Sequence, residues 1–236
     1  MLTPQEHKKH IGAKALLPMY TAEMKKYEEL YLQFNREGYT KELCEAYADA
    51  FIDAQKKPAV EDIVQIARLY DRIHELKNAQ FYLDMLSDKK LTGDERLRYC
   101  IECIKNKSKL GHWRDAEDFR TENISFMQKY SEKVDMTQLA EMYISLALAD
   151  CAAKNYSKAG RLLTAFGYKP QGSNDATLLE MMITAVYISA KSGDVESLRA
   201  AIGNAQACLN LFTSFEHPWS KDYLVDRIED AANGLL

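Results

Sequence analysis

The chain has 236 residues, of which 47% are hydrophobic and 28% are charged, so it could form either one large core or an elongated array. Its formal net charge of -4 argues against a surface that neutralises the phosphates of nucleic acid. Five cysteines without a regular framework, together with the lack of a secretory segment, predict a cytoplasmic protein. The apolar runs are shorter than the ~20 residues of a membrane helix, so no membrane partner is expected.

Helices are predicted along nearly the whole chain. Apolar residues recur with helical periodicity, and glycines and prolines fall between the apolar stretches. A capping box at Thr3–Glu6 predicts a helix within 1–20 that caps the N-terminal end. Five helical hairpins are expected over 21–215, and a last helix over 216–236 caps the other end. The sequence thus predicts one all-α domain over 1–236.

Five short turns recur along the predicted hairpins. Each turn joins an apolar helix to another helix whose first buried residue is small or aliphatic. Aligning these residues gives spacings of 36, 37, 43 and 39, and the residues are Leu43, Ala79, Ala116, Ala159 and Leu198. Spacings of this size are typical of hairpins stacked side by side, because a single hairpin cannot bury its own apolar face.

The pattern inside the hairpins resembles the tetratricopeptide repeat. The second hairpin fits best, with apolar, small and aromatic residues at the spacing of that family, namely Ile63, Ile66, Ala67, Tyr70, Ala79 and Leu83. The final three hairpins depart from it, because the position of the last aromatic residue of the first helix holds Lys107, Asp150 and Ser189. The resemblance covers about 22–212. It implies a right-handed α-α superhelix, or solenoid, whose first helices line a concave groove for a partner peptide.

Placing that groove on this sequence selects a basic half and an apolar half. The basic half comprises Arg68, Arg72, Arg98, Lys105 and Lys109, and the apolar half comprises Ile144, Leu148 and Tyr187. Such a groove suits an amphipathic partner segment that has acidic residues beside hydrophobic anchors. The alternative is that the cations form a solvated helix face and that the apolar residues touch a capping helix or a second copy in a homodimer.

The segment KLGHWRDAEDF, residues 109–119, looks like a small catalytic loop but is better explained as a joint between helices. His112 aligns with Asn155 and Asp194 at the turn and helix-start position, where Asn and Asp cap helices well. No Ser or Cys nucleophile is placed beside His112 by the pattern. The turn, the packing between helices and their close approach are expected from Gly111, Trp113 and Ala116.

No catalytic, cofactor or metal residue is predicted. Cys100 and Cys103 form a C-x-x-C pair, but no second pair accompanies them, and they occupy columns that are buried in the sister hairpins. His7 and His10 could share one helix face, although an exposed capping helix explains them as well. No phosphate-binding loop, dinucleotide fingerprint or nucleophile elbow is present.

The sequence therefore favours a non-enzymatic scaffold that binds a peptide segment of a partner protein. The alternative is a regulatory or sensory domain of similar architecture that binds a signalling peptide or small ligand and acts with a separate regulator. An RNA-binding helical-repeat protein would need a consistent polar pair in each repeat, which these columns lack. The carboxylate clamp of chaperone-binding family members is also missing, because Val64 and Arg68 stand where it requires lysine and asparagine.

Overall fold

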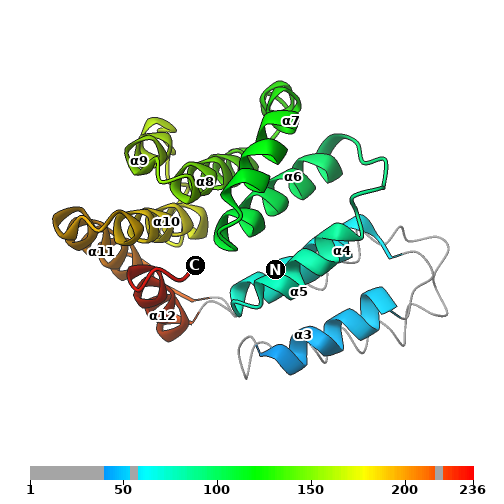
Figure 1. The fold of residues 1–236 in the computed structure, drawn as a ribbon. Helices are drawn as coiled ribbons and strands as arrows, with labels where there is room; N and C mark the ends of the chain where they lie inside the picture. Colours follow the sequence, from blue (N-terminus) through cyan, green and yellow to red (C-terminus); the bar gives the residue numbers. More distant parts are fainter. Residues whose placement is uncertain (1–39, 54–57, 216–219) are drawn as a thin grey trace. The chain divides into compact units, whose positions relative to one another are not determined.

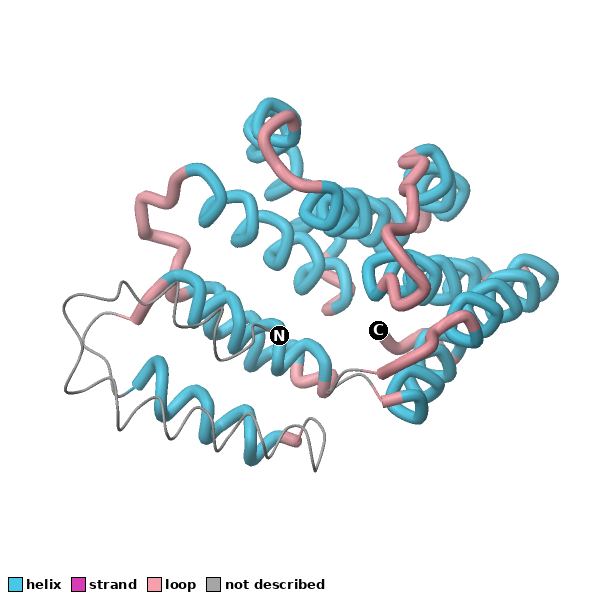
Figure 2. Tube along the Cα trace, turned by 180° about the vertical axis from the view of Figure 1, so that it is seen from behind, coloured by secondary structure: helices cyan, strands magenta, loops and turns pink. Residues whose placement is uncertain are grey.

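The computed structural model describes residues 40–53, 58–215 and 220–236. Every regular element in these ranges is a helix, which confirms the all-α prediction for this part of the chain (Figures 1 and 2). Two compact units are present, Met1–Leu86 and Ser87–Leu236. The predicted N-terminal cap within 1–20, the first helix of the first hairpin, and His7 and His10 lie outside the described residues.

The first unit contains three α-helices and one π-helical turn in its described part. Thr40 caps the first of them by accepting a hydrogen bond from the Leu43 backbone N–H at 3.3 Å. The second α-helix packs against the other two. In chain order the elements are α3 (Lys41–Ala48), η1 (Asp49–Asp53), α4 (Val60–Arg72) and α5 (Leu76–Asp84).

The hairpin formed by α4 and α5 buries every residue for which the sequence predicted a packing role. These residues are at most 3% exposed and comprise Ile63, Ile66, Ala67, Tyr70, Ala79 and Leu83. The rings of Tyr70 and Tyr82 stack with their centres 5.6 Å apart and so join the two helices. Periodicity was sufficient to predict these positions, although burial on α4 is wider than the predicted set, because all residues from 62 to 67 are buried.

In its described part, the second unit contains seven helices, and helices adjacent in the sequence pack against one another. They are α6 (Gly93–Lys109), α7 (Trp113–Ser131), α8 (Met136–Ala152), α9 (Tyr156–Ala165), α10 (Ala176–Ser192), α11 (Val195–Asn210) and α12 (Lys221–Ala232). The helices α6, α8 and α10 also pack on one another in succession, and α12 packs on α10 and α11 (Figure 1). No helix in the described ranges is long and apolar enough to cross a membrane.

Two apolar clusters hold the second unit together. One joins α6, α7 and α8 around Leu97, Ile104 and Met127, which are fully buried. The larger one joins α8 to α12 and includes Leu179 of α10 and Leu224 of α12, which are also fully buried. Leu224 and Ile228 of α12 are buried, and α12 packs on α10 and α11.

One turn geometry recurs at four joints between paired helices. A residue with a left-handed backbone conformation follows the first helix, with φ between 60° and 78°, and the next residue occupies the N-cap position of the second helix. Of these four N-cap residues, Asp194 accepts backbone hydrogen bonds through its side chain, whereas Glu75, His112 and Asn155 make no such bond. These four left-handed residues, His74, Gly111, Lys154 and Gly193, have the same spacings of 37, 43 and 39 as the aligned residues Ala79, Ala116, Ala159 and Leu198. The three alanines are buried, whereas Leu198 is only partly buried. The recurrence seen in the sequence is therefore a recurrence of backbone geometry.

Hydrogen bonds at these joints close the preceding helix in the manner of a Schellman motif. The N–H groups of Glu75, His112 and Asn155 donate to carbonyl groups five residues earlier, at 2.8 to 3.0 Å. At the fourth joint, the Gly193 N–H donates to the Ala190 carbonyl at 3.2 Å. These bonds satisfy backbone groups that a helix end otherwise leaves without partners.

The segment 109–119 is a joint of this kind, as the sequence predicted, with one correction. Gly111 has φ 78° and Ala116 is fully buried, as expected for a tight turn and a close approach of helices. Trp113, however, is 45% exposed and does not pack between helices. It is the first residue of α7, so no earlier turn of that helix lies beneath its ring. The Arg114 guanidinium lies 5.1 Å from the Trp113 ring centre instead.

Candidate functional site

The cations predicted for the basic half of the groove fall in both units. Arg68 and Arg72 lie on α4, whereas Arg98, Lys105 and Lys109 lie on one face of α6, because their spacings of seven and four residues repeat the helical turn. All five side chains are partly buried. The structure thus groups three of the five predicted cations on a single helix face.

Two of the α6 cations are already paired with carboxylates on their own helix. Arg98 Nε lies 2.8 Å from Asp94 Oδ2, and Lys105 Nζ lies 3.3 Å from Glu102 Oε1. The Glu102 side chain is only 6% exposed, so this second pair is shielded from water more than a surface pair is. Binding an acidic partner at these residues would require an exchange of ion-pair partners.

The apolar half of the predicted groove does not form an open surface. Ile144, Leu148 and Tyr187 are 2–8% exposed and belong to the larger core cluster of the second unit. Every residue from 144 to 151 is buried, so α8 has no solvent-facing side along this stretch. Burial also raises the pKa of the Tyr187 hydroxyl to about 12. The expectation that these residues line a groove is corrected, because neighbouring helices cover them.

The cysteines and His112, whose residue types suggested redox, metal or catalytic chemistry, lie in the core or at a joint between helices. All five cysteines lie in the described part of the chain as buried thiols without disulfides. Burial raises the pKa of Cys100 to about 11, so this thiol is protonated at neutral pH. His112 Nδ1 lies 3.9 Å from Asp115 Oδ2 on an exposed joint. Within the described ranges, no group of three or more His, Cys, Asp or Glu side chains could hold a metal ion.

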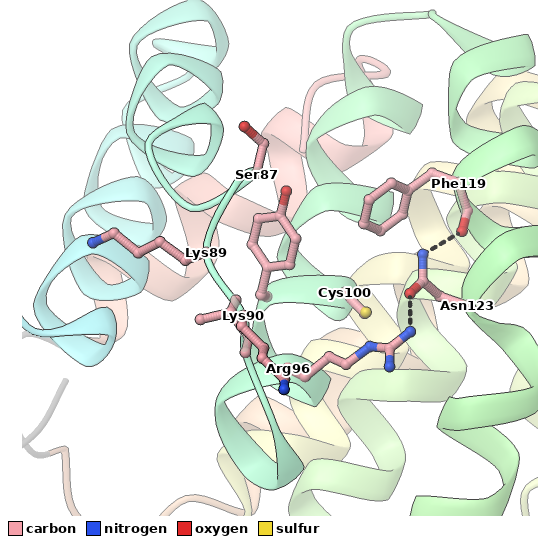
Figure 3. Close-up of a pocket in the computed structure, with 9 residues that line it drawn as sticks. Ser87, Lys89, Lys90, Arg96, Cys100, Phe119 and Asn123 are labelled. Atoms are coloured by element: carbon pink, nitrogen blue, oxygen red, sulfur yellow. Dashed lines mark hydrogen bonds between the residues drawn. The ribbon is translucent and has the colours of Figure 1, made fainter.

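A pocket that the sequence did not predict lies beside the first turns of α6 (Figure 3). It has a volume of about 350 Å³. The connecting segment 87–91 forms one side through Ser87, Lys89, Lys90 and Leu91, the helix α6 contributes Arg96, Tyr99 and Cys100, and α7 contributes Phe119 and Asn123. All of these residues belong to the second unit.

The position of Arg96 in this pocket is set by contacts with α7. Arg96 Nη2 donates to Asn123 Oδ1 at 3.0 Å, and Asn123 Nδ2 donates in turn to the Phe119 carbonyl at 2.9 Å (Figure 3). The guanidinium carbon lies 4.3 Å from the centre of the Phe126 ring. A hydrogen bond and a ring contact thus hold the cation at the pocket wall.

The pocket combines positive charge with an aromatic wall. Lys89, Lys90 and Arg96 line it, and no acidic side chain does. The rings of Tyr99 and Phe119 meet edge to face with their centres 5.9 Å apart. Sequence reasoning missed this site because Lys89 and Lys90 look like a solvated connection, and the pocket exists only when α6 and α7 bring their residues to that connection.

Comparisons with known proteins identify no relative. No protein-family model, curated protein sequence or solved structure matches this chain. The functional argument therefore rests on the helices, their joints and the side chains described above.

Proposed function

We propose that the chain is a non-enzymatic scaffold of stacked helical hairpins, similar to tetratricopeptide arrays, that binds a peptide segment of a partner protein. The observation that supports this proposal is the recurring joint, in which a left-handed residue is followed directly by the N-cap position of the next helix; the left-handed residues are His74, Gly111, Lys154 and Gly193. Recurrence at spacings near forty residues is typical of solenoids, which present long surfaces to extended partners.

The packing within the second unit favours the same architecture. The first helices α6, α8 and α10 pack in succession, and in this part of the chain α6 makes no contact with α10. Contacts that reach only the next hairpin are the defining property of a solenoid, whose stability is a sum over neighbouring pairs. A right-handed superhelix is accordingly our proposal for the arrangement of the hairpins.

In the second unit, the face of α6 that carries Arg98, Lys105 and Lys109 is the surface we propose for the partner. In the first unit, Arg68 and Arg72 on α4 are proposed as a separate contact. Because Ile144, Leu148 and Tyr187 are buried, the partner segment needs acidic residues more than hydrophobic anchors. The pair between Arg98 and Asp94 spans one helical turn, and the Asp94 side chain is 43% exposed. Such pairs contribute about 0–1 kcal/mol, so their exchange for a partner carboxylate costs little.

Fluorescence anisotropy with labelled acidic peptides would test this proposal. Lys105→Glu on α6 is expected to weaken binding by about tenfold or more, because it places negative charge opposite the acidic partner, and Arg68→Glu tests the contact on α4 separately. Lys129→Glu, an exposed cation in the last turn of α7, is the matched control and should leave affinity unchanged. If no acidic peptide binds the folded protein, the proposal fails, and sedimentation would then test the homodimer.

A further inference from the structure

We propose that the pocket formed by the segment 87–91, α6 and α7 binds a small phosphate monoester that carries a flat ring. Its volume of about 350 Å³ lies at the lower end of the range for small-molecule sites, which is about 300–1,000 Å³. A phosphate group and one ring fit within a space of this size. This proposal is independent of peptide binding on the other face of α6, because it uses different side chains.

The charge of the pocket is the first reason to expect an anion. Among the described residues, no carboxylate lies within ion-pair distance of Lys89, Lys90 or Arg96, in contrast to Arg98 and Lys105 on the same helix as Arg96. Asp88 lies within the connecting segment but not in the lining. Three cations that form no ion pair with a described carboxylate make a local positive potential that an anionic ligand can neutralise.

The fixed position of Arg96 is the second reason. A guanidinium carries five N–H donors, and the hydrogen bond to Asn123 uses one of them. Contact with the Phe126 ring limits the movement of the group further. A planar cation that is held in place loses little conformational freedom when it donates two parallel hydrogen bonds to phosphate oxygens. Lys89 and Lys90 then contribute as point charges from the exposed segment.

The aromatic side chains of the pocket are the reason to expect a ring in the ligand. Tyr99 and Phe119 meet edge to face and offer an aromatic surface beside Arg96, so one ligand can contact the cation and the rings together. Cys100 also lines the pocket, and its protonated thiol adds no negative charge that would repel a phosphate. The nonpolar wall predicts that phosphate attached to a ring binds more tightly than phosphate alone.

Titrations of the full-length protein with phenyl phosphate, inorganic phosphate and benzyl alcohol, followed by NMR, would test the proposal. Phenyl phosphate is expected to shift the Arg96 Nε–H and Asn123 side-chain amide signals and to bind at least about fivefold more tightly than the other two probes. Shifts confined to other residues would overturn the site. If inorganic phosphate bound as tightly as phenyl phosphate, the proposed role of the ring would be overturned. If benzyl alcohol bound as tightly as phenyl phosphate, the proposed role of the charge would be overturned.

Two variants and one control complete the test. Arg96→Gln is expected to weaken phenyl phosphate binding by about tenfold or more, because a charge-assisted bidentate contact is lost. Lys89→Ser, Lys90→Ser changes only exposed residues, so it keeps the test valid if Arg96→Gln fails to fold, and it should weaken binding by about fivefold. Arg114→Gln, which removes an exposed arginine of α7, should have no effect. Equal losses in all three variants would overturn the proposal.

Discussion

The residue that ends the first helix of each hairpin must adopt a left-handed conformation, and only two of the four are glycine. Gly111 and Gly193 have φ of 78° and 74°, whereas His74 and Lys154 have φ of 60° and 62°. A side chain with a Cβ atom makes this conformation less favourable by about 1 kcal/mol. The joints at His74 and Lys154 therefore carry backbone strain that the other two lack.

Lys154→Gly is expected to raise the free energy of unfolding by about 0.5–1 kcal/mol, because glycine adopts this φ without the steric cost of a Cβ atom. Gly111→Ala should lower it by about 1 kcal/mol. An added Cβ at Gly111 would have no atom within 4 Å, so this loss would come from conformation alone. Urea-induced unfolding followed by circular dichroism measures both changes.

The control for this prediction is Lys169→Gly. Lys169 is exposed, lies outside the helices and does not have a positive φ, so glycine there only increases the freedom of the unfolded chain. We expect no gain in stability from this variant. A gain at Lys169 equal to that at Lys154 would contradict the assignment of strain to the left-handed turn.

Asp62 on α4 is a buried acid whose ionisation should oppose folding. It is 3% exposed, and burial, followed by the charge of Glu61, raises its pKa to about 7. The folded state therefore binds a proton that the unfolded state releases between pH 4 and 7, so the Asp62 contribution to stability falls as pH rises through this range. Asp62→Asn should remove this dependence.

Measurement of the unfolding free energy at pH 4.5 and pH 8 tests this expectation. Relative to the parent protein, Asp62→Asn should gain stability at pH 8 by up to about 4 kcal/mol, with a smaller gain at pH 4.5, where the parent Asp62 is protonated in the folded state. Carbon-detected NMR of the Asp62 carboxyl group supplies an independent titration. Parallel stability profiles for the two proteins would contradict the raised pKa.

At the scale of elements, a buried carboxylate ties three helices together. Asp150 of α8 is 1% exposed, and its Oδ1 atom lies 3.1 Å from Arg120 Nη1 of α7 and 2.9 Å from Lys158 Nζ of α9. Asp150 occupies the position where the sequence pattern placed an aromatic residue in the best-matching hairpin. An ion triad thus fills a place that Tyr70 fills by ring packing in α4.

Removal of the shared carboxylate should cost far more than removal of its exposed partner. Asp150→Ala leaves the Arg120 guanidinium, 15% exposed, with Glu117 as its remaining carboxylate partner among the described residues and should lower the free energy of unfolding by about 2–3 kcal/mol. Lys158→Met removes a side chain that is 53% exposed and should cost less than about 1 kcal/mol. Thermal denaturation of the two variants distinguishes the values, and equal losses would contradict the assignment of Asp150 as the centre of the triad.

Features that depend on neighbouring residues could be predicted from the sequence, whereas features that depend on distant helices could not. The joints were predictable because a glycine or a capping residue such as Asp194 acts on its immediate neighbours. The burial of Leu148 was not predictable, because it depends on helices that lie far apart in the sequence. The stretch around it is apolar on every side, and such a helix can be read either as a groove wall or as a core. The pocket at Arg96 was not predicted either, because it forms only when α6 and α7 bring their residues to the segment 87–91.

At the scale of the whole molecule, each unit has its own set of buried residues. The two clusters of the second unit contain only residues from Leu97 to Leu236. The helix α12 closes one end, where Leu224, Ile228 and Ala231 are at most 2% exposed. Because α12 packs on both α10 and α11, its removal would expose part of the larger apolar cluster.

A chain limited to residues 87–236 is therefore expected to fold by itself. Because both clusters are complete within it, its amide NMR spectrum should match that of the same residues in the full-length protein, and it should unfold cooperatively in urea. A shorter chain, 87–215, lacks α12 and exposes the apolar surface of α10 that Leu224 and Ile228 cover, so it should bind a hydrophobic dye and lose cooperativity. If 87–236 behaved like 87–215, the second unit would need residues before Ser87 for its core, and the division of the molecule into two units would be overturned.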